Sequence, residues 1–265
     1  MFELDFMKNA FMAGIVVSIL CPIIGLFIVL RRNSMIGDTL SHSSFAGVAI
    51  GLVIGINPIF TAFLFTSICA LIIEFLRGYF KKYAELVMSI VLTFSLGIAI
   101  ILISTGKASA KVNSFLFGSI LTVSKEDLII IASAGLITLI ILFFIFNKLM
   151  YVTFDENGAK TSGINVKLTN YVFTLLVGAT ISLSIRIMGI LVISSIIVVP
   201  VATAMQLKMN FKKTLLFSVL FALIDILLGL VLSYYINGAP GGTIAITTVF
   251  VLILTLFYAH FNVSD

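Results

Sequence analysis

The chain is a succession of long apolar runs separated by short polar segments. A helix that crosses a membrane needs about 20 mostly apolar residues, and nine runs approach that length. The pattern predicts an all-α, polytopic membrane protein with eight or nine transmembrane helices, because the two runs beside Arg186 could pack as half-length elements. The runs are 10–30, 40–56, 58–76, 85–104, 127–146, 170–187, 188–205, 214–236 and 243–259.

Composition favours the same class of protein. Of the 265 residues, 61% are hydrophobic and only 10% are charged, and the mean hydropathy is +1.26. A soluble domain of this length needs more charge to cover its surface. We interpret residues 1–265 as a single transmembrane domain. The net charge of +5 does not indicate a nucleic-acid partner, because the basic residues fall between apolar runs.

The positions of lysine and arginine predict which side of the membrane each loop faces. Cytoplasmic loops carry an excess of positive residues. If the loop after the first run is cytoplasmic, 11 of the 16 basic residues face the cytoplasm and 5 face outward. The distribution therefore predicts a multi-pass protein of the cytoplasmic (inner) membrane with an external amino terminus. The outer residues are then Lys8, Lys107, Lys111, Lys125 and Arg186.

Two segments do not fit a simple spanning pattern. Residues 112–124 are apolar but too short to cross, which favours a re-entrant or interfacial helix on the outer side. The cytoplasmic loop at about 147–169 contains TFDENGAKTSGIN, in which Asp155 suits an N-cap, Glu156 a first turn and Gly163 the left-handed position after a helix end. A helix of about two turns is unstable alone in water. We expect another protein surface to hold it, and an ordinary ordered loop is the alternative.

Asp38 and His42 are the strongest candidates for chemistry. In a helix, residues four apart share one face, with Cβ atoms about 5–6 Å apart. A carboxylate and an imidazole so placed can hold one divalent cation and suit Mn²⁺, Zn²⁺ or Fe²⁺. Ionisable groups within a membrane usually mark a substrate path. A lone histidine is often a satisfied core residue, but here the carboxylate lies one turn earlier and hydroxyl residues surround the pair, namely Thr39, Ser41, Ser43 and Ser44.

Asp225 is the deepest charge in the chain, in the middle of the run 214–236. An ionised Asp at that depth costs about 2.5–3.5 kcal/mol on insertion scales. It must be protonated, paired or exposed to a wet cavity, so a structural role and a place on the ion path are both open. Arg186 could anchor a span or control access at the outer opening of the ion path.

Motifs of self-sufficient enzymes are missing from the sequence. There is no GxxxxGK[ST] loop, so we do not expect the chain to hydrolyse ATP itself. There is no HExxH helix and no GxSxG elbow either. We expect a transport subunit without a permanently bound cofactor, for which a divalent metal is the cargo. An intramembrane metalloenzyme built on Asp38 and His42 would need a third ligand, and no motif supplies one.

Four segments carry a resemblance to a known family: RRNSMIGDTLSHSSFAGVAIG (31–51), FLFGSIL (115–121), DENGAKTSG (155–163) and GILVISSIIVVPVATA (189–204). In this order they resemble the membrane permeases of bacterial ATP-binding-cassette importers for zinc, manganese and iron. The resemblance implies a type II importer-like fold. It also implies an assembly of two permease copies, an ATPase subunit dimer and an extracytoplasmic metal-binding protein.

The same resemblance implies roles for particular residues. Asp38 and His42 match positions that coordinate the transported metal. The segment 155–163 matches the one that docks on the ATPase, with Asp155, Ala159 and Gly163 in matching order and Glu156 beside them. Asp225 matches no standard acid of the family, so its role is open. The prediction is an importer permease for Mn²⁺, Zn²⁺ or Fe²⁺; the alternative is an ion-coupled secondary metal transporter in which Asp38, His42 and Asp225 relay protons.

Overall fold

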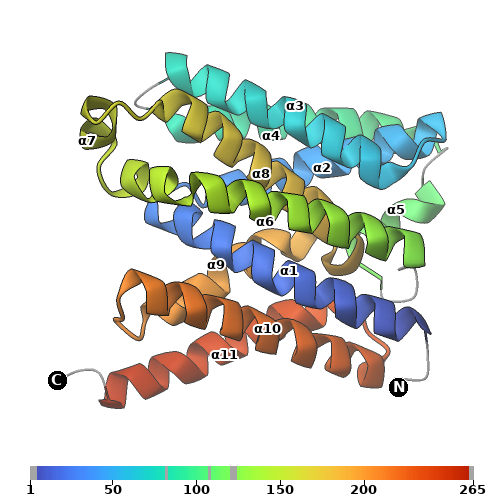
Figure 1. The fold of residues 1–265 in the computed structure, drawn as a ribbon. Coiled ribbons are helices and arrows are strands. Elements are labelled where there is room, and N and C mark those ends of the chain that lie inside the picture. The colour runs from blue at the N-terminus through green and yellow to red at the C-terminus, as the bar shows by residue number, and fades with distance from the viewer. Residues whose placement is uncertain (1–4, 81–82, 107–108, 120–123, 263–265) are drawn as a thin grey trace. The chain divides into compact units, whose positions relative to one another are not determined.

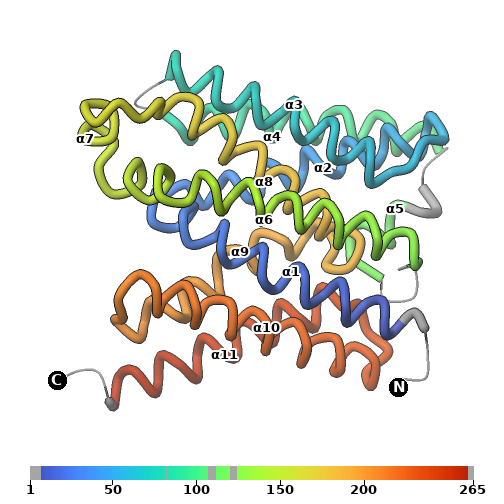
Figure 2. The backbone as a smooth tube through the Cα atoms, in the orientation of Figure 1, coloured from blue at the N-terminus to red at the C-terminus, as the bar shows by residue number. Residues whose placement is uncertain are grey.

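The computed structural model describes residues 5–80, 83–106, 109–119 and 124–262 (Figures 1 and 2). Over these ranges the regular structure is entirely helical, so the all-α prediction is confirmed. The helices are α1 (Asp5–Leu30), α2 (Met35–Ile54), α3 (Pro58–Tyr79), α4 (Ala84–Ser104), α5 (Ser109–Leu116), α6 (Lys125–Phe154), α7 (Glu156–Thr161), α8 (Val166–Met188), α9 (Ile190–Met205), α10 (Phe211–Ile236) and α11 (Pro240–Asn262).

Each of the nine apolar runs is a helix in the structure. Within the described ranges, seven helices are long and apolar enough to cross a membrane, namely α1, α3, α4, α6, α8, α10 and α11. The apolar helix α9 is shorter, with 16 residues, and α2 has 20 residues with a polar first half. The expected division near Arg186 occurs at Gly189, between α8 and α9.

The segment expected at 112–124 is only partly described. Its helix, α5, ends at Leu116 and has 8 residues, so it is indeed too short to cross a membrane. Residues 120–123 lie outside the described part of the chain, and so do the last two residues of FLFGSIL. The placement of this segment on the outer side stays a prediction.

The helices fall into two compact units that alternate along the sequence. Unit 1 comprises residues Met1–Ser34, Asn113–Ala132 and Ser184–Asp265, and unit 2 comprises Met35–Val112 and Ser133–Leu183. Unit 1 therefore holds α1, α9, α10 and α11, whereas unit 2 holds α2, α3, α4 and α7. Helices α5, α6 and α8 contribute to both. The assignment of residues 1–265 to one transmembrane domain stays a prediction.

In unit 1, α1 and α10 run in opposite directions. The Phe27 ring near the end of α1 lies 5.8 Å from the Phe211 ring at the start of α10. Helices α10 and α11 are joined by a short turn after Asn237, which takes a left-handed conformation (φ 53°). The end of α1 and the start of α10 thus lie at one end of this unit, and the α10–α11 turn lies at the other.

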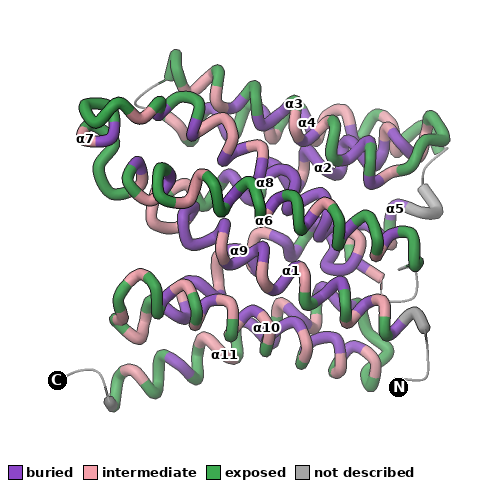
Figure 3. Tube along the Cα trace, in the orientation of Figure 1, coloured by how far each residue is buried: buried purple, intermediate pink, exposed green. Residues whose placement is uncertain are grey.

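In unit 2, α2 packs against α3 and α4 and is buried over most of its surface (Figure 3). Gly47 allows a close approach, because a Cβ there would lie 2.6 Å from the Cα of Ala62 in α3. Asn57 caps α3, with its side chain accepting a hydrogen bond of 2.9 Å from the backbone N–H of Ile59. The second half of α2 is therefore held closely against the start of α3.

Candidate metal site and coupling helix

The structure confirms that Asp38 and His42 lie on one helix, one turn apart. Helix α2 begins at Met35, so Asp38 is in its first turn and His42 in the next. The Asp38 carboxylate is exposed, and it is near enough to act electrostatically on the partly exposed His42 ring. His42 Nδ1 is buried and has no hydrogen-bond partner. The pair thus presents one carboxylate and one unengaged imidazole nitrogen.

The four hydroxyl residues near the pair hold α2 in place. They are buried, and their hydroxyl groups bond to backbone carbonyls and to neighbouring helices of unit 2 instead of facing the two candidate ligands. They therefore fix α2 and do not extend the ligand set. Their hydrogen bonds join Thr39 to the carbonyls of Met35 (3.0 Å) and Met88 (3.4 Å), Ser41 to that of Gly37 (2.7 Å), Ser43 to that of Thr39 and to Ser95 Oγ (both 2.9 Å), and Ser44 to Ser182 Oγ (3.4 Å).

No cluster of three or more His, Cys, Asp or Glu side chains that could hold a metal occurs among the described residues. Within that part of the chain, Asp38 and His42 therefore leave a coordination shell incomplete. This fits a cargo that must be released, because a closed shell of protein ligands is the arrangement of structural metal sites. Their assignment as metal ligands stays a prediction.

Asp225 belongs to unit 1, whereas Asp38 and His42 belong to unit 2. The Asp225 side chain lies in the middle of α10, is 1% exposed, and has no hydrogen-bond partner for either carboxylate oxygen. It is the most enclosed acidic side chain among the described residues. Its place on an ion path stays a prediction.

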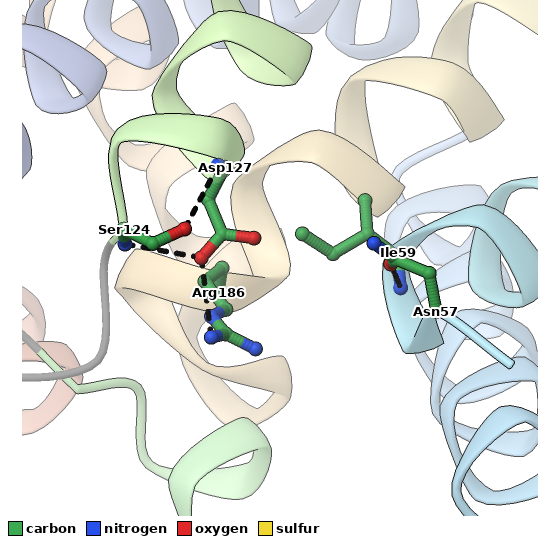
Figure 4. A network of polar contacts seen from close by, with 5 residues as sticks. All are labelled: Asn57, Ile59, Ser124, Asp127 and Arg186. Carbon is green, nitrogen blue, oxygen red and sulfur yellow. Dashed lines mark hydrogen bonds and ion pairs between the residues drawn. The ribbon is translucent and has the colours of Figure 1, made fainter. Parts of the chain in front are cut away.

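Arg186 forms an ion pair that the sequence did not reveal. Its Nη2 atom lies 3.1 Å from Oδ2 of Asp127 in unit 1 (Figure 4). Asp127 also receives the backbone N–H of Ser124, and Ser124 Oγ receives that of Asp127, both at 3.1 Å. This reciprocal cap starts α6. Asp127 was missed as a partner, although a serine three residues before an acid is a recognisable capping signal. The finding favours the anchoring role for Arg186.

Three glycines let three backbone segments cross beside this ion pair, in unit 1. Gly118 and Gly189 have φ of 74° and 75°. A Cβ on Gly189 would strike the backbone at Leu116 and Gly118, and a Cβ on Gly241 would strike Met188. Hydrogen bonds of 3.3 Å from Ser119 N to Arg186 O and from Gly241 N to Phe117 O complete the crossing. The break between α8 and α9 is thus fixed by neighbouring backbone.

The short helix expected in the cytoplasmic loop is α7, and its own chain holds it. Asp155 caps it, accepting a hydrogen bond of 2.8 Å from the backbone N–H of Gly158, and Lys160 pairs with Glu156 at 2.6 Å. Gly163 follows the helix with φ 79°. Ala159 is fully buried against Val152 of α6 and Val166 of α8. The expectation that another protein must hold this helix was incomplete, because Ala159 anchors it internally.

The residues of α7 therefore separate into two faces. Ala159 points into the protein and cannot contact a partner directly. Asp155, Glu156 and Lys160 are exposed. A docking partner would meet these charged residues, and Ala159 would act by fixing the position of the helix.

A polytopic helical fold with two neighbouring ionisable side chains on one helix fits a transport protein, because ionisable groups within a membrane usually mark a substrate path. The model of the ABC 3 transport family matches residues 3–259, and the chain belongs to this family. The family resemblance inferred from the four sequence segments is thereby confirmed.

Relatives align with nearly the whole chain. It is 45% identical over 256 residues to a probable metal transport system membrane protein of Treponema pallidum (strain Nichols), covering 97% of this chain and 96% of the relative. It is 35% identical to the high-affinity zinc uptake system membrane protein ZnuB of Buchnera aphidicola subsp. Schizaphis graminum (96% and 98% covered). It is 29% identical to the manganese import system permease protein ScaB of Streptococcus gordonii (97% and 92%).

A solved structure shows the same fold. PsaBC from Streptococcus pneumoniae, in complex with Fab, superimposes with a TM-score of 0.86 at 29% identity, covering 97% of this chain and 92% of that one. The fold described above is therefore that of a solved protein.

Proposed function

We propose that the chain is the membrane permease subunit of an ATP-binding-cassette importer that moves Mn²⁺, Zn²⁺ or Fe²⁺ into the cell. The observation that carries the proposal is the Asp38–His42 pair on α2, with His42 Nδ1 buried and unengaged, in a chain of a transport family. Relatives named for zinc and for manganese support a divalent transition metal as cargo.

The chemistry of the pair suits a transient site. Asp38 contributes negative charge, which offsets part of the cost of moving a cation out of water. His42 contributes a nitrogen ligand, which favours transition metals over Mg²⁺ and Ca²⁺. Two protein ligands leave positions for water, backbone carbonyls or a second copy of the chain, so the ion can still be released. Ligand type alone does not choose among manganese, zinc and ferrous iron.

Energy comes from a partner in this proposal, because the sequence lacks a phosphate-binding loop. An ATPase subunit dimer docks on the exposed face of α7, at Asp155 and Glu156. Ala159 then passes the movement to α6 and α8, through its buried contacts with Val152 and Val166. A homodimer of permeases and an extracytoplasmic metal-binding protein complete the assembly.

The charge distribution supports an external amino terminus. In unit 1, Arg31, Lys212 and Lys213 lie at the end where α1 finishes and α10 begins, while the Arg186–Asp127 pair lies toward the α10–α11 turn. The more basic end is cytoplasmic under the positive-inside rule. Lys81, Lys82 and Lys107, which also entered the sequence argument, lie outside the described residues.

The first test replaces His42 by alanine in cells that carry the whole transport system, with uptake of radioactive zinc and manganese as the measurement. We expect uptake to fall about ten-fold or more, as losing about 1.4 kcal/mol of ion stabilisation would require. The matched control is His260→Ala, which removes the other histidine, at the end of α11. Normal uptake by a well-expressed His42→Ala protein would remove the site assignment.

The ion-coupled alternative is separated by a second measurement. The wild-type chain should co-purify with an ATPase subunit, and a Glu156→Lys change on the exposed face of α7 should weaken that association. Metal transport by the purified chain alone, driven by a proton gradient, would instead favour the secondary transporter.

A further inference from the structure

A cavity of about 570 Å³ lies in unit 2 where four helix ends meet. It is bounded by the end of α3, the start of α4, α7 and the start of α8. It is well separated in sequence from Asp38 and His42, and neither residue lines it. Its charged and aromatic lining consists of Glu74, Arg77, Phe80, Glu156, Lys160, Lys167 and Tyr171.

The lining carries three basic residues against two carboxylates, and each carboxylate is already paired with one of the basic residues. Glu74 accepts hydrogen bonds from Arg77 Nη1 (2.9 Å) and from Thr174 Oγ1 (2.8 Å). Glu156 is paired with Lys160. These contacts use one nitrogen of Arg77, and a guanidinium group has five N–H donors.

Lys167 supplies the excess charge. Its ammonium group lies 6.0 Å from the centre of the Tyr171 ring, and no carboxylate pairs with it within the described residues. Helix α4 starts at Ala84, in the cavity wall, and no side chain caps its first N–H groups. The positive end of its helix dipole therefore adds to the positive charge of the cavity. Glu85 in the same first turn is the nearest opposing charge along α4, but it does not line the cavity.

Exposed aromatic residues indicate the depth of the cavity in the membrane. Tyr79 is 74% exposed and Tyr83 is 62% exposed, and both flank the α3–α4 connection beside the cavity. Tyrosine side chains in such positions lie at the level of the lipid head groups. The apolar part of α3 ends just before Arg77. The positively charged cavity therefore opens where phosphate groups of the inner leaflet are found.

We propose that this cavity binds the phosphate head group of an anionic phospholipid. Basic pockets between transmembrane helices on the cytoplasmic side are suited to this ligand. Lys167 and the free donors of Arg77 hold the phosphate, and the half-apolar wall accepts the glycerol and the first acyl carbons. Since Glu156 and Lys160 of α7 belong to the wall, a bound lipid connects α7 to α3 and α8 and stabilises the helix on which the ATPase docks.

The test measures lipid binding by the full-length chain in detergent micelles, using native mass spectrometry with phosphatidylglycerol or phosphatidylcholine. We expect the wild-type chain to prefer phosphatidylglycerol. The variant Lys167→Gln should bind it about five-fold more weakly, because it removes the lining cation that no carboxylate neutralises. The matched control is Lys148→Gln, which removes an exposed cation on α6 outside the cavity and should bind as the wild type does. Equal loss in the control, or none in Lys167→Gln, would overturn the site.

A second arm separates a lipid from a free anion. Inorganic phosphate and glycerol 3-phosphate at millimolar concentration should leave phosphatidylglycerol bound, because neither has acyl chains to bury. Displacement by either compound would show that the cavity takes soluble phosphates and would overturn the lipid assignment. The readout is lipid binding and not metal uptake, so it can fail while the Asp38–His42 site stands, and the reverse also holds.

Discussion

At the residue scale, His42 and Asp225 both carry buried polar atoms without hydrogen-bond partners. Leaving such an atom unsatisfied costs about 1–3 kcal/mol. His42 is partly exposed beside a carboxylate, so a passing cation can offset its cost. Asp225 is 1% exposed, and no hydrogen-bond partner among the described residues offsets its cost. The two residues therefore differ in what they can do, although both are ionisable groups in apolar helices.

This difference predicts the effect of removing the Asp225 carboxyl group. Asp225→Leu should raise the midpoint of thermal unfolding, because a leucine of similar size removes two unsatisfied oxygens; the expected rise is about 2–4 °C per kcal/mol gained. Asp127→Leu is the opposite case and should lower the midpoint, because it leaves Arg186 without its carboxylate. The measurement is thermal unfolding of the purified proteins in detergent. A lower midpoint for Asp225→Leu would mean that this carboxyl group has a partner in the working protein.

At the scale of elements, the break between α8 and α9 depends on glycine at particular positions. Gly189 has φ 75° and ψ 158°, a conformation essentially restricted to glycine. Its neighbours are backbone atoms of the segment after α5, which cannot move aside as a flexible side chain would. Gly118, in the segment after α5, and Gly241, at the start of α11, also lie so close to neighbouring backbone that neither has room for a Cβ. The crossing therefore fixes where α9 begins and where α11 begins.

We expect Gly189→Ala to destabilise the protein by more than the cost of placing a non-glycine residue at a positive φ. The conformation costs a residue with a Cβ about 1–3 kcal/mol, and the collision with the Gly118 backbone adds to that cost. Gly55→Ala is the matched control, because Gly55 has φ 81° but open space around its Cβ position. Membrane expression and the thermal midpoint measure both variants. Equal losses in the two variants would show that the backbone crossing contributes nothing.

At the scale of the whole molecule, the lipid solvent determines what the sequence alone can predict. Each spanning helix must be apolar over a nearly fixed length, so the nine runs located the helices, although α6 continues past the predicted end at residue 146 to Phe154. The cap at Asp155 and the left-handed Gly163 were predicted because both are local signals. The Arg186–Asp127 pair, the crossing of Gly118, Gly189 and Gly241, and the burial of Ala159 were not predicted. They join positions far apart in the sequence, and no local pattern encodes such contacts.

The orientation of the chain provides the last prediction. Cys21 and Cys69 are buried, so a cysteine placed on the surface should be the main site for a membrane-impermeant maleimide. Glu126→Cys lies at the start of α6 beside the Arg186–Asp127 pair, and we expect it to react in intact cells. Lys212→Cys lies at the opposite, basic end of unit 1 and should react only after the membrane is opened. This result follows from the excess of positive charge at that end. Labelling of Lys212→Cys in intact cells would reverse the topology, place the exposed face of α7 outside the cell, and so remove both the ATPase docking site and the inner-leaflet lipid site.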